Sequence, residues 1–107
     1  MKTTTVGEYT VVRGESAADN WEIIGASEGS WVWLHLNSFP SPHVIVQHSD
    51  PPAEVLAAAA ELCKESSKYK RLSNLKVCYT KVSNLEKGHS VGSVSYRSNR
   101  QVKTLKL

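Results

Sequence analysis

Four histidines and two cysteines are the residues of this chain best suited to chemistry, and metal binding is the first possibility to test. Their spacing speaks against it, because no two of them form the CxxC or HxxxH pairs that bind zinc. His43 and His48 would also point to opposite faces of a regular strand, since an odd number separates their positions. The sequence therefore predicts no metal site and no other cofactor.

Covalent catalysis needs a serine or cysteine beside a base, on a sharp turn or at a helix terminus. Cys63 lies within a predicted helix and Cys78 within a predicted strand, so both are expected to be buried free thiols. The chain has no GxSxG, P-loop or GxGxxG motif, and its N-terminal glutamates have the pattern of ordinary surface residues. We therefore expect a protein that is not an enzyme, without catalytic residues or a small-molecule substrate.

The run WVWLHLNSFPSPHVIV contains two apolar strands, 31–37 and 43–48, joined by a proline-bearing turn. Trp31, Trp33 and His35 share one strand face, and each could stack a nucleic-acid base for roughly 1–3 kcal/mol. Apolar neighbours favour Trp33 as a core residue, whereas Trp31 at the strand's edge could serve either purpose.

His35 and His43 belong to these two strands, which the short turn makes antiparallel neighbours. The two side chains are therefore expected to lie close together. Two interpretations stay open: a structural polar pair within the core, or nucleic-acid contacts at the rim of the sheet.

Hydrophobic periodicity and turn residues predict the remaining elements. Asp50 is expected to cap a helix of about five turns that has Pro51 in its first turn, and Ser98-Asn99 is expected to form a tight hairpin. The predicted fold is α+β, a single domain over residues 1–107, with an antiparallel sheet of about five to six strands packed by one long and one short helix. The predicted strands are 8–14, 31–37, 43–48, 75–82, 91–97 and 101–107, and the predicted helices are a short one within 15–29 and a long one over 49–71.

The net charge of +3 conceals a division between the two halves of the chain. Residues 1–50 have two basic and six acidic side chains, a balance of −4, whereas residues 51–107 have eleven basic and four acidic, a balance of +7. A basic surface of this kind suits RNA phosphates, with affinity that depends little on sequence. The expected contacts are Lys64, Lys68, Lys70 and Arg71 at the end of the long helix and Arg97, Arg100 and Lys103 around the last hairpin.

A second functional class also fits this charge division. In it the acidic half docks a basic protein partner, and the lysines serve only solubility. Neither class involves a membrane: the opening MKTTTVGEYT has no apolar stretch typical of a signal peptide, and no apolar run approaches the roughly 18–20 residues needed to span a bilayer. The expected location is the cytosol or the nucleus.

Several short motifs resemble the NFACT RNA-binding domain family. Trp33-Leu34-His35-Leu36 and His43-Val44-Ile45 resemble that family's W-L-H-V … P-G-S-H-V-I block. Further similar segments follow in the same order along the chain, and the spacing is nearest to the small eukaryotic members. These segments are Gly14–Asn20 against G-R/K-N-x-x-Q/E-N, Val77–Thr80 and Ser83–Lys87 against V-x-Y-T … N-L-K-K, and Val91–Val94 against V-G-x-V/I.

This resemblance implies a cytoplasmic domain that binds rRNA or tRNA at the large ribosomal subunit, in a ribosome quality-control setting. Trp31, His35 and His43 lie in or beside the matching block and stay candidate RNA contacts, with a structural role for the two histidines as the alternative. Three positions depart from the family: Trp31 replaces an acidic residue, Glu15 replaces Arg or Lys, and Gln47 replaces a frequent Arg. The two missing cations shift the expected RNA surface toward the basic C-terminal half.

Overall fold

The computed structural model describes residues 1–107, and its two helices and eight strands confirm the α+β class. Two short 3₁₀ turns, Val82–Asn84 and Asn99–Gln101, interrupt the C-terminal strands. Neither α-helix is long and apolar enough to cross a membrane. The elements in chain order are β1 (Lys2–Val6), β2 (Tyr9–Arg13), α1 (Ala17–Gly25), β3 (Val32–Leu36), β4 (Val44–Val46), α2 (Ala53–Glu65), β5 (Lys76–Lys81), β6 (Leu85–Lys87), β7 (Val94–Tyr96) and β8 (Lys103–Lys106).

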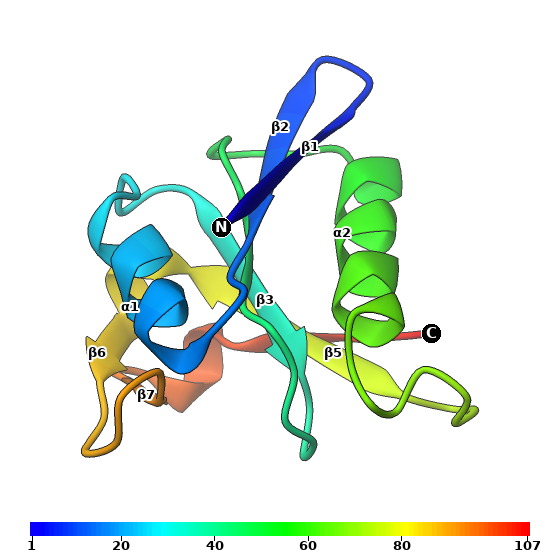
Figure 1. The fold of residues 1–107 in the computed structure, drawn as a ribbon. Helices are drawn as coiled ribbons and strands as arrows, with labels where there is room; N and C mark the ends of the chain where they lie inside the picture. The colour runs from blue at the N-terminus through cyan, green and yellow to red at the C-terminus, as the bar shows by residue number, and fades with distance from the viewer.

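Six strands form one antiparallel sheet in the order β1-β2-β4-β3-β5-β8, and β6 and β7 form a separate two-stranded ribbon. The predicted pairing of the two central strands is confirmed, with Trp33 of β3 opposite Ile45 of β4. The helix α2 covers one face of the sheet, whereas α1 and the ribbon cover the other (Figure 1). The main sheet thus has the expected number of strands and the expected helical cover.

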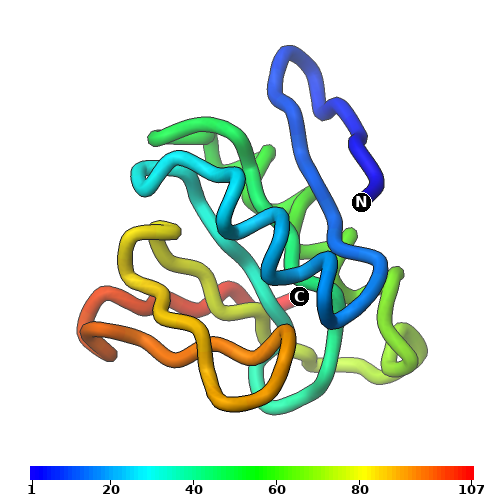
Figure 2. The backbone as a smooth tube through the Cα atoms, turned by 60° about the vertical axis from the view of Figure 1, so that its left-hand side comes forward, coloured from blue at the N-terminus to red at the C-terminus, as the bar shows by residue number.

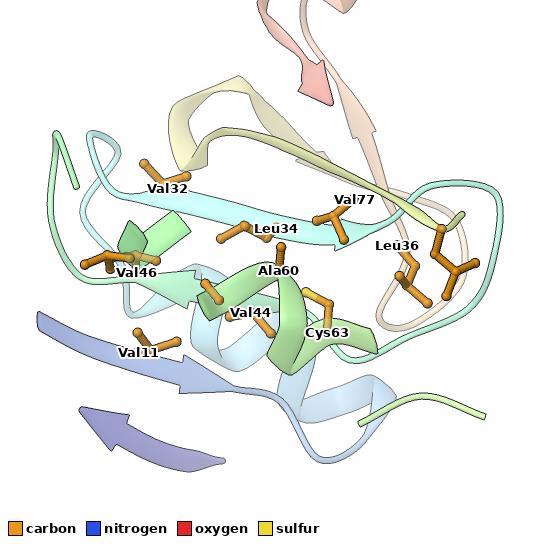
Figure 3. Packing of buried hydrophobic residues seen from close by; sticks show 12 residues of the cluster. Val11, Val32, Leu34, Leu36, Val44, Val46, Ala60, Cys63 and Val77 are labelled. Carbon is orange, nitrogen blue, oxygen red and sulfur yellow. The ribbon is translucent and has the colours of Figure 1, made fainter. Parts of the chain in front are cut away.

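The two faces of the sheet bury two separate clusters. On the α2 side, Val32, Leu34 and Leu36 of β3 pack with Ala60 and Cys63 of the helix (Figure 3). Alternate residues of β3 point to the other side, where Trp33, 1% exposed, packs among side chains of α1, β4 and the ribbon. Because both faces are covered, the central strands are apolar at successive positions. The core position predicted for Trp33 is confirmed, and so are two buried free cysteines.

The long helix is shorter at both ends than predicted. It runs over Ala53–Glu65 and not over 49–71, and its N-cap is Pro52 without a side-chain cap bond. The predicted cap was wrong because Asp50 is held in a turn, its N–H donating to His48 Nδ1 at 2.9 Å. At the other end Ser67 Oγ donates to the Lys64 carbonyl at 2.7 Å and accepts from the Tyr69 N–H at 3.1 Å. A hydroxyl that bonds the backbone in this way competes with the helix and ends it.

The predicted C-terminal hairpin was also wrong. The strand β7 pairs with β6, and β8 pairs with β5, so Ser98 and Asn99 connect two different sheets. The buried side chain of Asn84 explains the connection: its Oδ1 accepts from the Ser98 N–H and its Nδ2 donates to the Ser98 carbonyl, both at 2.9 Å. Asn84 Nδ2 also lies 3.1 Å from Thr80 Oγ1, which ties this corner to β5.

The strand β1 was not predicted. It forms a hairpin with β2 around Gly7, whose φ of +60° suits a residue without a Cβ. Its sequence KTTTV has no apolar alternation, because four of its five residues are exposed. The tube in Figure 2 shows this hairpin standing out from the body of the molecule at the N-terminal end.

Candidate nucleic-acid interface

The first group of predicted RNA contacts lies in the loop that follows α2. Lys68, Lys70 and Arg71 are exposed there and have no acidic partner within 4 Å. Because α2 ends at Glu65, these cations lie beyond the helix, which corrects their predicted place on its last turn. Lys64 is on that last turn, half-buried and close in sequence to exposed glutamates. We call Lys68, Lys70 and Arg71 the α2-loop patch.

The second group lies in the segment between β7 and β8 and at the first residue of β8. Arg97, Arg100 and Lys103 are exposed, and Arg97 Nη1 lies 3.4 Å from Glu86 Oε1. In Figures 1 and 2 the orange-to-red turn between β7 and β8 lies on the side of the molecule away from the yellow-green loop after α2. The structure therefore presents two basic patches and does not bring the seven predicted cations together. We call Arg97, Arg100 and Lys103 the β8 patch.

The predicted histidine pair does come together. The rings of His35 and His43 are 5.0 Å apart and nearly perpendicular. Trp33 stacks parallel to His35 at 5.7 Å and meets His43 edge to face at 5.3 Å. Tyr96 of the ribbon reaches Trp33 at 5.9 Å. These four rings, the ring cluster, join β3, the start of β4 and β7. Trp31 lies apart, half-buried beside the same cluster of core side chains.

Residues of the segment before and within α1 hold His43 in place. The His43 N–H donates to Asn20 Oδ1 at 3.2 Å, and the His43 carbonyl accepts from the Gly14 N–H at 3.0 Å. A side chain at Gly14 would collide with the amide of Asn20. The segment 14–20 therefore positions the start of β4, because Gly14 and Asn20 both hydrogen-bond the backbone of His43.

The ring cluster is uncharged at neutral pH. Burial lowers the pKa of His35, and burial together with the nearby His35 lowers the pKa of His43 to about 3. Burial raises the pKa values of the Cys78 thiol and the Tyr96 hydroxyl, which lie 3.3 Å apart. His35 Nδ1 lies 2.7 Å from the Leu36 carbonyl oxygen and donates to it. At neutral pH these groups can therefore make polar contacts without bringing a charge into the cluster.

A cavity of about 410 Å³ opens beside the ring cluster. All four rings and Cys78 line it, with the loop 37–40 on one side and residues 92–94 on the other. Sequence reasoning found the two histidines but missed Tyr96 and Cys78 as neighbours, because the position of the ribbon depends on long-range contacts. The only hint in the sequence was that the Val91–Val94 segment, which contributes to the cavity, resembles a motif of the same family as the histidine block.

A second cavity, of about 340 Å³, lies between the start of α1 and the chain after α2. Lys68 of the α2-loop patch lines it opposite Glu15 and Ser16. Glu15 is engaged with Arg13, whose Nη2 lies 3.7 Å from Glu15 Oε1. The acidic side chain of Glu15 therefore lowers the positive charge next to the patch.

Comparison with known proteins gives a consistent result. The chain matches the model of the NFACT protein RNA binding domain over residues 1–98. It is 34% identical over 73 residues to the Rqc2 homolog RqcH of Bacillus subtilis (strain 168), a match of 66% of this chain and 13% of that protein. The structure of the C-terminal of the fibronectin/fibrinogen-binding protein from Streptococcus suis superposes with a TM-score of 0.86 at 28% identity, covering 94% of this chain and 41% of that one. This chain thus spans less than half of either relative, and it belongs to the NFACT RNA-binding domain family.

Proposed function

We propose that residues 1–107 act as a single, non-catalytic RNA-binding domain that works in the cytoplasm on rRNA or tRNA at the large ribosomal subunit. The observation that carries this proposal is the family match over residues 1–98. Similarity to RqcH, a homolog of Rqc2, supports a ribosome quality-control setting. This chain corresponds to a small part of that relative, so the proposal is limited to RNA binding.

The charge distribution supports the same function. The α2-loop patch and most of the β8 patch are exposed cations without acidic partners, so they are available to phosphates. Such contacts give affinity and orientation with little sequence preference. In the acidic half, two of the six acids already have a basic partner, since Glu15 contacts Arg13 and Asp19 lies 2.6 Å from the N-terminal ammonium group.

Crosslinking in cells tests the proposal directly. Ultraviolet crosslinking and stringent purification of the tagged protein should recover rRNA of the large subunit or tRNA. A variant in which Lys68, Lys70 and Arg71 are replaced by Glu is the matched control, and it should recover less of the same RNA. Recovery of protein partners alone would support the alternative class, a protein-interaction module that uses the acidic half.

A further inference from the structure

The cavity beside the ring cluster has no charged side chain in its lining. Its polar groups are neutral at pH 7, since the pKa values of both histidines are lowered and those of Cys78 and Tyr96 are raised. A phosphate or a carboxylate would therefore find no counter-ion there. The lining suits a neutral, planar group that contacts rings on one side and hydrogen-bonding groups on the other.

Two ring nitrogens of this cluster have no hydrogen-bond partner. Trp33 Nε1 and His43 Nδ1 are both buried and unpaired, and the two residues are only 1% and 4% exposed. Buried polar atoms without partners are rare in folded proteins, and an absent binding partner is one explanation for them. The edge of a nucleic-acid base has donors and acceptors as well as a flat apolar face. A base thus matches both the rings and the unpaired polar atoms.

The wall formed by residues 92–94 is firmly attached to α1. Trp21 Nε1 donates to the Ser93 carbonyl at 2.8 Å, and Gly92, with a φ of +87°, passes so close that a Cβ would lie 2.8 Å from the Ala17 Cα. Lys87, opposite Val94 in the ribbon, has its Nζ 5.2 Å from the centre of the Trp21 ring. Lys87 is exposed and has no acidic partner within 4 Å, so a cation without a carboxylate partner lies across the ribbon from Val94, a lining residue of the neutral cavity.

We propose that this cavity takes one unstacked base of a single RNA strand, with Lys87 beside the phosphate at its rim. The inference rests on the proposed RNA-binding function and adds a site to it: the two basic patches hold the backbone, and the ring cluster holds a base. It assigns Tyr96, Val94 and Lys87 to this site and leaves Trp33 as the buried ring that supports it. The cavity then distinguishes single-stranded RNA, whose bases are accessible, from a duplex, whose bases are stacked and paired.

The first test uses the unmodified protein. Its affinity is measured by fluorescence anisotropy for a labelled five-nucleotide uridine strand and for a strand of equal length whose sugars all have no base. Losing one well-stacked base contact should weaken binding roughly 5- to 150-fold. Equal affinity for the two strands would overturn the base site while leaving RNA binding intact. Failure to bind either strand or ribosomal RNA would overturn the proposed function itself.

The second test locates the effect. Val94→Trp should fill the cavity and remove the preference for the strand with bases, leaving its affinity close to that of the abasic strand. Val91→Trp is the matched control, because Val91 lies three residues away, is 55% exposed and does not line the cavity. Circular dichroism confirms folding of both variants. Should Val94→Trp not fold, Lys87→Ala takes its place and should weaken binding of the uridine strand by a few-fold. A folded Val94→Trp protein that keeps the preference would refute the assignment.

Discussion

The imidazole rings of His35 and His43 meet edge to face, with their centres 5.0 Å apart and their planes at 89°. His43 is 4% exposed, so a proton on its ring would be poorly solvated and close to a second imidazole. The pair is therefore stable only in the neutral form, so the free energy of unfolding should depend on pH.

Lowering the pH should destabilise the fold. The folded-state pKa of His43 is about 3, against an ordinary value of 6.5, so below pH 6.5 the unfolded chain binds a proton that the folded protein does not. The stability that depends on a neutral His43 is therefore present above pH 6.5 and is lost as the pH falls from 6.5 toward 3. Between pH 7 and pH 5, His43 alone should account for a loss of about 2 kcal/mol. Urea unfolding at a series of pH values measures it.

His43→Phe should remove most of this pH dependence, since it replaces the titrating ring by a neutral one. His89→Gln is the control, because His89 is exposed, and it should leave the slope unchanged. A free energy of unfolding that is equal at pH 7 and pH 5 in the parent protein would contradict the expected coupling.

Trp33→Ala should damage folding before it affects binding. Truncating a fully buried tryptophan costs about 3–5 kcal/mol, a large part of the 5–15 kcal/mol typical of a small domain. Trp31→Ala is the comparison on the same strand face, and its half-buried side chain should cost less. Thermal melts of both variants test this order. A Trp33→Ala protein that melts like the parent but loses RNA would show that the ring serves binding and not the core.

Reversing the charges of the α2-loop patch should weaken RNA binding and its dependence on salt. If about four phosphates of a single strand are neutralised, the log–log slope is near −3, and raising salt from 50 to 200 mM lowers affinity roughly fifty-fold. Replacing Lys68, Lys70 and Arg71 by Glu should flatten this slope equally for unrelated RNA sequences. These side chains are exposed, so the melting temperature should change little.

Reversal of Glu8, Glu22 and Glu28 to Lys is the matched control, because these acids are exposed and unpaired, and it should not reduce affinity. Reversal of the β8 patch, which lies away from the α2-loop patch, should add its own loss independently. Unchanged RNA affinity after both reversals would mean that phosphates are held elsewhere.

Asn84→Ala should destabilise the corner between the two sheets. The substitution removes the amide that bonds both backbone groups of Ser98 and the hydroxyl of Thr80. Leaving such groups unpaired costs about 1–3 kcal/mol. Amide hydrogen exchange should accelerate in β7 and at Ser98 more than in β3, and Ser83→Ala, an exposed neighbour, should have no such effect. Uniform protection in the Asn84→Ala protein would contradict this role.

The central hairpin was predictable because its apolar residues record burial on two faces, and the proline turn fixes the direction of the second strand. The ends of α2 were not, since a serine hydroxyl at Ser67 and an imidazole at His48 override helix propensity through bonds made within the turn. The strand β1 was missed because an exposed strand leaves no apolar pattern. Pairing of β7 with β6 depends on Asn84, whose three bonds with Thr80 and Ser98 no local pattern reveals.

The site was predicted in part for the same reasons. His35 and His43 lie on paired strands next to the Leu34–Val44 pair, so their contact follows from the hairpin alone. The other half of the cavity comes from the ribbon, whose position is fixed by Trp21 and Gly92 against α1. Separation of the cations into two patches likewise depends on which sheet edge β8 joins, and charge counts along the chain contain no such information.

The edges of the six-stranded sheet are β1 and β8, each held by one neighbour only. A mechanical load applied through Lys2 and Lys106 would reach β1 at the open end of its hairpin, where Lys2 faces Arg13, and β8 where Lys106 faces Lys76. Both strands would then peel away one hydrogen bond at a time, and no row of bonds would be sheared together. A domain tethered through these strands should therefore yield at low force, with the central strands β3 and β4 separating last.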